Sequence, residues 1–187
     1  MRILASFGSA ALAGYTIGLR VVMFALLPSF GMSNAAATMV GQALGAKKPE
    51  RAEAAVWKTA RYNAVFLALI GLTFVVFAKQ IVAGFTGDPG IAKYGVLALR
   101  TVAYGFVVYA YGMVIGNSFN GAGDTRTPTW INLFVFWILE IPLAWVLSHQ
   151  TGLGAFGVFI AMTVAFSTLA VVSAVVFRKG RWKGQVV

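Results

Sequence analysis

Long stretches with almost no charged side chains are the feature of this sequence that most constrains its fold. The five stretches lie within Ala10–Ala46, near Tyr62–Phe85, near Tyr94–Phe119, at about Thr129–Leu147 and at about Leu153–Phe177. Each is close to or longer than the roughly 20 residues that an α-helix needs to cross a bilayer. Only 11% of all residues are charged, against roughly 25% in soluble domains, which leaves too few to cover a water-facing surface. The sequence therefore predicts an all-α membrane protein, a polytopic helical bundle of about five transmembrane helices.

Basic side chains collect on one side of the expected spans. Ten of the fifteen lie there, namely Lys47, Lys48, Arg51, Lys58, Arg61, Arg126, Arg178, Lys179, Arg181 and Lys183. The positive-inside rule makes this side cytoplasmic, so we expect a multi-pass protein of the plasma (inner) membrane with a cytoplasmic C-terminus. In a soluble protein the net charge of +10 would suggest a nucleic-acid partner. Because these residues flank apolar runs, we expect the lipid bilayer, and no nucleic acid, as the partner.

Two prolines inside the expected spans predict helix bends. Pro28 lies in the first run, which is too long for one straight span, and Pro142 lies in the fourth. Proline has no N–H group, so it frees a backbone carbonyl inside a helix. At membrane depth a freed carbonyl must face protein or a wet cavity. Each bend is therefore either part of a functional site or an ordinary packing kink.

Glu140 is the only carboxylate deep within an expected span. Ionisable groups at this depth are costly and by default mark functional sites. Asn132 precedes it by eight residues, so both lie broadly on one helix face. Two interpretations stay open: Glu140 and Asn132 line a substrate or ion pathway, or Glu140 forms a structural ion pair with Arg20 or Arg100.

The third expected span carries a second group of polar side chains. Tyr109 and Asn120 share a helix face, and Asn117 lies close by. On a helix otherwise made of apolar and small residues, these side chains either line a polar cavity or bond to neighbouring helices. They are further candidates for a substrate or ion pathway.

The residues needed for enzyme chemistry or for a metal site are missing from the sequence. There is no cysteine, and His149 is the single histidine. A protein zinc site needs three or four such ligands, and no Ser–His–acid set can be assembled around one histidine at an expected span end. We therefore expect no catalytic residue, no metal and no enzyme activity.

Four tryptophans lie near expected span ends: Trp57, Trp130, Trp145 and Trp182. Tryptophan is enriched where a membrane meets water. We expect these four side chains to anchor the chain at the interface.

Several short motifs resemble those of the MATE (multidrug and toxic compound extrusion) family of transporters. The first comprises Gly41, Gln42, Gly45 and Ala46, followed by Arg51 and Ala52. The second is the glycine turn at residues 119–128, with Gly121, Asp124 and Pro128. Residues 141–144 and the closing Arg181-Trp182-Lys183 also match. The motifs are individually modest, but they occur in the family's order and cover nearly the whole chain.

The resemblance implies a fold and a function. MATE proteins have twelve helices in two lobes and rock between outward-facing and inward-facing states. Residues 1–187 would supply helices eight to twelve, most of the C-terminal lobe, and the missing N-terminal lobe would be a partner. The implied function is secondary active transport, in which drugs or organic cations leave by antiport with protons or sodium and no further cofactor is needed. The alternatives are a lipid-linked sugar flippase of the same superfamily, or a non-transporting remnant or structural membrane subunit.

One departure from the family pattern bears on ion coupling. Sodium-linked members carry an acidic residue midway along the tenth helix, at a position that falls near Tyr109 here. The sequence has no carboxylate at that place. The resemblance therefore does not support the sodium site of this lobe, and Glu140 remains the candidate coupling residue.

Overall fold

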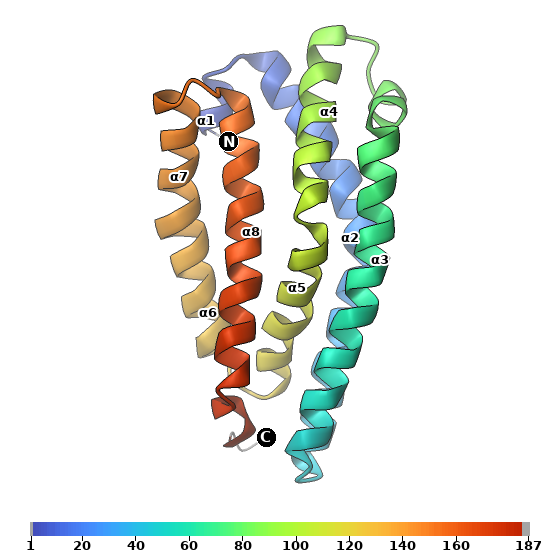
Figure 1. The fold of residues 1–187 in the computed structure, drawn as a ribbon, viewed down its shortest axis with the longest axis vertical. Helices are drawn as coiled ribbons and strands as arrows, with labels where there is room; N and C mark the ends of the chain where they lie inside the picture. The colour runs from blue at the N-terminus through green and yellow to red at the C-terminus, as the bar shows by residue number, and fades with distance from the viewer. Residues whose placement is uncertain (1, 185–187) are drawn as a thin grey trace.

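The structure, a computed structural model, describes residues 2–184 and forms them into helices and the turns between them (Figure 1). The helices in chain order are α1 Arg2–Ala5, α2 Ser9–Gly45, α3 Pro49–Ala83, α4 Pro89–Tyr104, α5 Phe106–Gly121, α6 Arg126–Asn132, η1 Leu133–Glu140, α7 Ile141–Trp145, η2 Val146–Gln150, α8 Ala155–Arg178 and η3 Arg181–Gly184. The segments η1 and η2 are wound as π-helix and η3 is a 3₁₀ turn. From α6 to η2 the chain is one continuous rod of Arg126–Gln150.

The predicted class and number of spans are confirmed. Four helical rods in the described part of the chain are long and apolar enough to cross a membrane: α2, α3, Arg126–Gln150 and α8. A fifth span results if α4 and α5, which are bent by 62° relative to each other, count as one. The sequence predicted one span over this pair and did not predict the break between its halves.

Acidic residues fix the start of two helices. The Asp88 carboxylate accepts hydrogen bonds from the backbone N–H groups of Gly90 and Ile91, at 2.7 and 3.1 Å, and so caps α4. Asp124 accepts from the backbone N–H of Thr127 at 3.0 Å in the first turn of α6. Both satisfy donors that a helix start leaves unpaired, which explains why the chain can reverse direction sharply at these turns.

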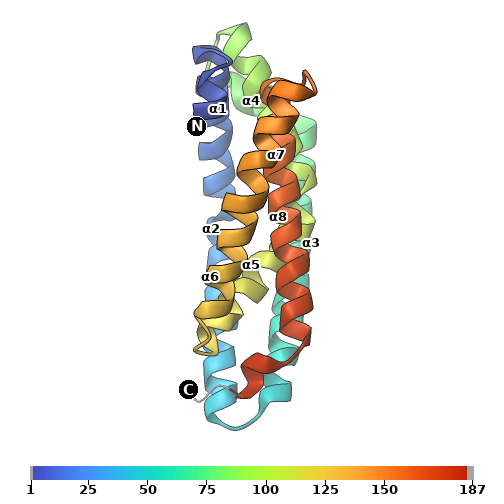
Figure 2. The same cartoon turned by 90° about the vertical axis from the view of Figure 1, so that its left-hand side faces the viewer.

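The rods pack side by side into an elongated bundle (Figure 2). Helix α2 contacts α3, α4 and α5, while α8 contacts α4 and α5 from another side. The Arg126–Gln150 rod packs chiefly against α8. The broken pair α4–α5 therefore lies between the α2–α3 pair and α8.

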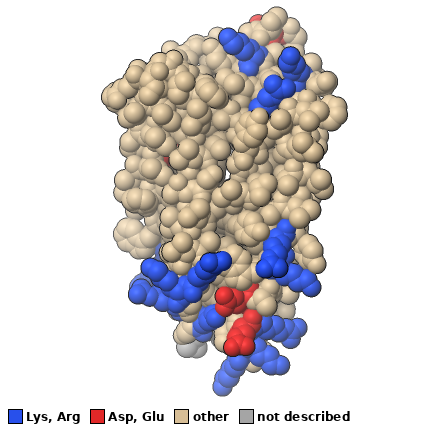
Figure 3. Space-filling view, viewed as in Figure 1, with Lys and Arg blue, Asp and Glu red and all other residues tan. Residues whose placement is uncertain are grey.

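Charged side chains lie at the two ends of the bundle, with a largely uncharged band between them (Figure 3). We call the end that contains the α2–α3 turn and η3 the basic end. Helix α3 has 35 residues, a length of about 52 Å, whereas the hydrocarbon core is about 30 Å thick. The first turns of α3, at the basic end, therefore extend beyond the hydrocarbon.

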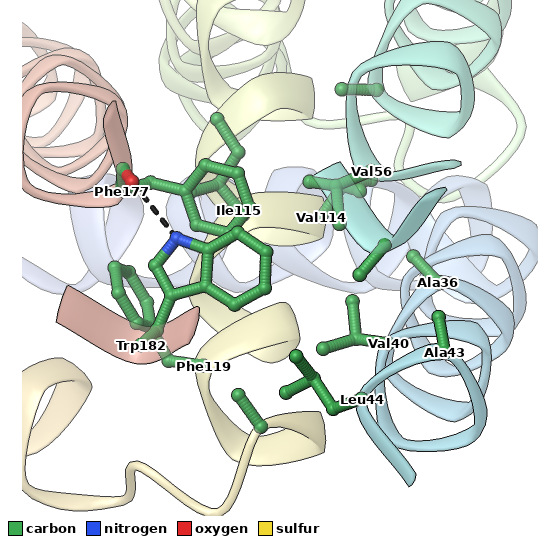
Figure 4. Close-up of a cluster of buried hydrophobic side chains, with 13 residues drawn as sticks. Ala36, Val40, Ala43, Leu44, Val56, Val114, Ile115, Phe119, Phe177 and Trp182 are labelled. Atoms are coloured by element: carbon green, nitrogen blue, oxygen red, sulfur yellow. Dashed lines mark hydrogen bonds between the residues drawn. The ribbon is translucent and has the colours of Figure 1, made fainter. Parts of the chain in front are cut away.

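Trp182 closes the basic end from inside the bundle, contrary to the expectation that it anchors the chain at the interface (Figure 4). Its side chain is 1% exposed and stacks on Phe177, with ring centroids 4.5 Å apart. Its indole N–H donates to the backbone carbonyl of Phe177 at 2.9 Å. Gly180, with φ of +71°, turns the chain after α8, and this reversal carries the ring back among α2, α3 and α5. We call the buried side chains around it the Trp182 cluster: Val40, Leu44, Val56, Phe119, Phe177 and Trp182.

Candidate transport cavities

The break at Gly105 divides the third expected span near its middle. Gly105 has no side chain, and the space beside it is occupied by α8. A Cβ atom on residue 105 would lie 2.9 Å from the Thr163 side chain. Near the break, the Thr163 hydroxyl on α8 donates to the backbone carbonyl of Thr101 at 3.1 Å. A neighbouring helix thus satisfies a carbonyl at the break, which is what irregular backbone at membrane depth requires.

A first cavity, of about 150 Å³, opens beside this break. Its wall comes from α2, α4, α5, α8 and the end of η1, and most of it is apolar or aromatic. The aromatic members of the wall are Tyr15, Phe30, Phe106, Tyr109 and Phe166. Aromatic faces attract organic cations as well as apolar groups, so the chemistry of this wall suits an amphipathic cation.

Glu140 contributes the one carboxylate of this wall. It is half-buried and ends the π-helical segment η1, directly before α7, which contains Pro142. Neither Arg20 nor Arg100 forms an ion pair with it among the described residues, where the only ion pair joins Lys183 and Glu53. Arg100 instead donates from Nε to the backbone carbonyl of Val75 on α3 at 3.0 Å. The structural ion pair considered for Glu140 is therefore not formed in residues 2–184.

A second cavity, of about 300 Å³, adjoins the first toward the basic end. Phe30 and Tyr109 line both cavities. The remaining candidates from the sequence, Asn117, Asn120 and Asn132, all line the second one. The fold therefore places all five candidate side chains, which come from two separate spans, on two neighbouring cavities.

Amide side chains form a hydrogen-bonded chain in the second cavity. The Asn120 amide N–H donates to the Asn117 side-chain oxygen at 3.3 Å, and the Asn117 amide N–H donates to the Asn34 side-chain oxygen at 2.7 Å. Each of these amides keeps further donors or acceptors free for water or a ligand. This arrangement ties α2 to α5 and gives the cavity a polar, uncharged wall.

Sequence reasoning missed the contribution of α2 to this wall. Ser33 and Asn34 line the second cavity, and Ser29 lies one turn before Ser33 with its hydroxyl oxygen buried and unpaired within the described residues. Two serines one helical turn apart, followed directly by an asparagine, are a readable signal in an apolar run.

The structure brings two of the family-like motifs into contact at the basic end. Gly41 on α2 faces the backbone carbonyl of Gly121 on α5, and a Cβ atom on Gly121 would overlap the carbonyl of Ala37 at 2.2 Å. Gln42 and Gly45 lie exposed at the end of α2, and Pro128 lines the second cavity. The two glycines allow α2 and α5 to touch through their backbones.

The two prolines lie in different surroundings. Pro28 lies inside the continuous helix α2, near its middle by sequence, and Figure 1 shows the first half of α2 inclined to the second. Pro142 lies in the first turn of α7, directly after the π-helical segment η1 and within the continuous rod. A bend at Pro142 and a role of either proline in transport stay predictions.

Comparison with known proteins agrees with this architecture. Residues 1–146 match the family model MatE. A probable multidrug resistance protein NorM of Thermotoga maritima is 25% identical over 180 residues, which is 96% of this chain and 39% of that protein. A protein of the same description from Rhodopseudomonas palustris is 30% identical over 164 residues, 86% of this chain and 35% of the relative. The crystal structure of MATE in the straight conformation superposes with a TM-score of 0.87 at 25% identity, covering 92% of this chain and 39% of that one.

The fold and the cavities define a multi-pass helical membrane protein with two adjoining, partly polar cavities. The chain belongs to the MatE family, and the two relatives named above are described as probable multidrug resistance proteins. It spans less than two fifths of the length of the relatives named above.

Proposed function

We propose that the chain is the C-terminal lobe of a secondary active transporter, equivalent to helices eight to twelve of the family. In this proposal it exports drugs or organic cations in exchange for protons or sodium and works together with an N-terminal lobe. The observation that carries the proposal is the pair of adjoining cavities, which share Phe30 and Tyr109 and contain Glu140 in an otherwise uncharged wall. An aromatic wall with one carboxylate suits a bulky cation.

Glu140 is the proposed coupling residue. A carboxylate inside an apolar wall can bind either a proton or a substrate cation, and the two exclude each other, as antiport requires. The absence of an ion pair to Arg20 or Arg100 within residues 2–184 favours this role, because a bound arginine would hold the carboxylate charged.

The test replaces Glu140 by Gln in the complete transporter, with Glu50→Gln as the matched control because Glu50 is exposed at the start of α3. Glutamine keeps the shape of the side chain but cannot exchange a proton. Glu140→Gln is expected to keep its thermal stability yet to lose efflux of a fluorescent organic cation driven by a pH gradient. Efflux at the normal rate with an unchanged pH profile in Glu140→Gln would refute the coupling role.

The 187-residue chain alone is not expected to transport. Alternating access requires two lobes that move about a shared site. Proteoliposomes that contain only this chain should show no gradient-driven efflux, and addition of the N-terminal lobe should restore it. Efflux by the chain as a single copy would contradict the two-lobe proposal.

We further propose that the basic end faces the cytoplasm and that the membrane is the plasma (inner) membrane. The α2–α3 turn, the first part of α3, the end of α8 and η3 carry nine of the ten basic residues at that end, and cytoplasmic ends are enriched in lysine and arginine. Cysteines introduced at Lys48, Asp88 and Gly184 test the orientation, since the chain has no native cysteine. An impermeant thiol reagent added to intact cells should label only the cysteine at Asp88, and the opposite labelling pattern would reverse the orientation.

A further inference from the structure

A groove of about 500 Å³ runs along the outer surface of α3 at the basic end. One helix supplies its whole lining: Ala54, Trp57, Lys58, Arg61 and Tyr62. Two of these side chains are cationic and two are aromatic. None of them belongs to the two cavities described above.

The aromatic floor of the groove is held in place by other helices. The Trp57 ring packs against Tyr111 of α5 and Phe177 of α8, with ring centroids 6.4 and 6.1 Å apart. The guanidinium of Arg178 lies 5.3 Å from the centre of the same ring. Arg178 is therefore a third cation next to the groove. The Trp57 ring that it contacts is held in place by its packing against α5 and α8.

Lys58 and Arg61 are exposed, and neither forms an ion pair within residues 2–184. The nearest acid on α3, Glu53, already binds Lys183 of η3. The two cations of the lining therefore have no ion-pair partner among the described residues.

A lipid-sized apolar strip continues directly from the groove. Along α3, residues at steps of three or four are half or more exposed: Tyr62 at 61%, Val65 at 62%, Leu69 at 62%, Leu72 at 63% and Val76 at 52%. These side chains lie on one helix face. No other element of the described chain covers this face, so the strip runs from the basic groove along the uncharged band of Figure 3.

We propose that this groove binds the headgroup of an anionic phospholipid, whose acyl chains lie along the strip from Tyr62 to Val76. The phosphate accepts hydrogen bonds from Lys58 and Arg61, the geometry for which an arginine fork is well suited. The Tyr62 and Trp57 rings lie at the level of the glycerol, where amphipathic rings are most favourable. Charge complementarity and the continuous apolar strip together distinguish this occupant from a soluble anion, which would not use the strip.

The experiment measures lipid retention by native mass spectrometry on the purified chain in detergent. Phosphatidylglycerol and phosphatidylcholine with identical acyl chains are added in equal amounts. The test variant is Lys58→Gln/Arg61→Gln. The matched control is Lys79→Gln/Lys93→Gln, which removes the same charge from exposed positions at the opposite end. Circular dichroism of each variant checks that the helices are intact.

The unmodified chain is expected to retain phosphatidylglycerol in preference to phosphatidylcholine. Removal of two basic contacts should weaken phosphatidylglycerol binding on the order of thirtyfold, while the control variant retains it. An equal loss of phosphatidylglycerol binding in both variants would show that binding depends only on the net charge of the chain, and would overturn the proposal. So would displacement of the lipid by inorganic phosphate, which would indicate a simple anion site, or by an added N-terminal lobe, which would indicate a protein interface.

Discussion

The same helices behave differently in two regions of the bundle. At the basic end, α2, α3, α5 and α8 close around the Trp182 cluster, in which side chains are buried and aromatic rings stack. Toward the middle, the helices line two cavities that hold Glu140 and three linked amides. The contrast indicates that the helices leave room for polar side chains beside the two cavities, whereas apolar and aromatic side chains fill the space around Trp182.

Truncation of Trp182 should have the largest effect on stability. Trp182→Ala removes a fully buried ring and its hydrogen bond, and such changes cost about 3–5 kcal/mol. The matched control is Trp130→Ala, because Trp130 is 68% exposed. The free energy of unfolding of each variant is measured on the purified chain, by titration with a denaturing detergent that is followed by circular dichroism. Similar losses in the two variants would show that burial of Trp182 does not stabilise the basic end.

A methyl group on Gly121 should have the next largest effect. Gly121→Ala forces a Cβ atom onto the Ala37 carbonyl at 2.2 Å, and overpacking of this kind costs about 1–3 kcal/mol. The same change at Gly116 serves as control, because a Cβ there meets nothing within 4 Å. Gly116→Ala should be neutral or stabilising by up to about 1 kcal/mol. Equal stability of the two variants in the same unfolding experiment would contradict the backbone contact between α2 and α5.

Cysteines introduced one at a time at two adjacent positions can distinguish the water-accessible cavity from the buried core. Asn117 lines the second cavity, whereas its neighbour Ser118 is fully buried. Asn117→Cys should react with a small thiol reagent about tenfold or more faster than Ser118→Cys, because reactivity requires an accessible thiolate. The rate of modification in detergent, followed by mass, gives the answer. Equal rates would mean that the second cavity is closed to water.

The smallest expected effect concerns the ion pair at the basic end. Lys183, through its hydrogen bond and its charge, holds the pKa of the Glu53 carboxyl below its usual range. A lowered folded-state pKa gives stability that is present above the ordinary carboxyl value of about 4.3 and is lost as the pH falls through the lower value. Since the pair is partly exposed, its contribution is about 0.2–1 kcal/mol. Melting curves between pH 6 and pH 3 should therefore fall slightly more for the unmodified chain than for Glu53→Gln, and parallel curves would show that the pair adds nothing.

The spans were predictable because they depend on summed hydropathy, which a window of twenty residues averages reliably. The bend was not predictable in the same way. The sequence predicts bends at Pro28 and Pro142, whereas the 62° change of direction lies at Gly105, between α4 and α5. A lone glycine in an apolar helix is common, and the contact of Gly105 with Thr163 of α8 becomes visible only in the folded chain.

The candidate site was partly predictable for a related reason. Glu140, Tyr109 and the three asparagines stand out in the sequence because polar groups are rare in apolar helices. Their grouping into adjoining cavities depends on which helices are neighbours, which no local pattern encodes. Trp182 was misjudged for the same reason, since its burial follows from the reversal at Gly180 and from partners 60 or more positions away in the chain.

The broken helix has a mechanical consequence. The half before Gly105, α4, packs against α2 near its start, where Gly14 of α2 lies against the backbone of Ile91 and Gly95. The half after it, α5, is bound to a different helix. The side-chain amide of Asn63 on α3 donates to the backbone carbonyl of Ala110 at 3.1 Å. A small torsion at Gly105 would therefore tilt one half against the other without breaking a helical turn in either. Because Gly105 lines the cavity that contains Glu140, such a tilt would change the shape of that cavity.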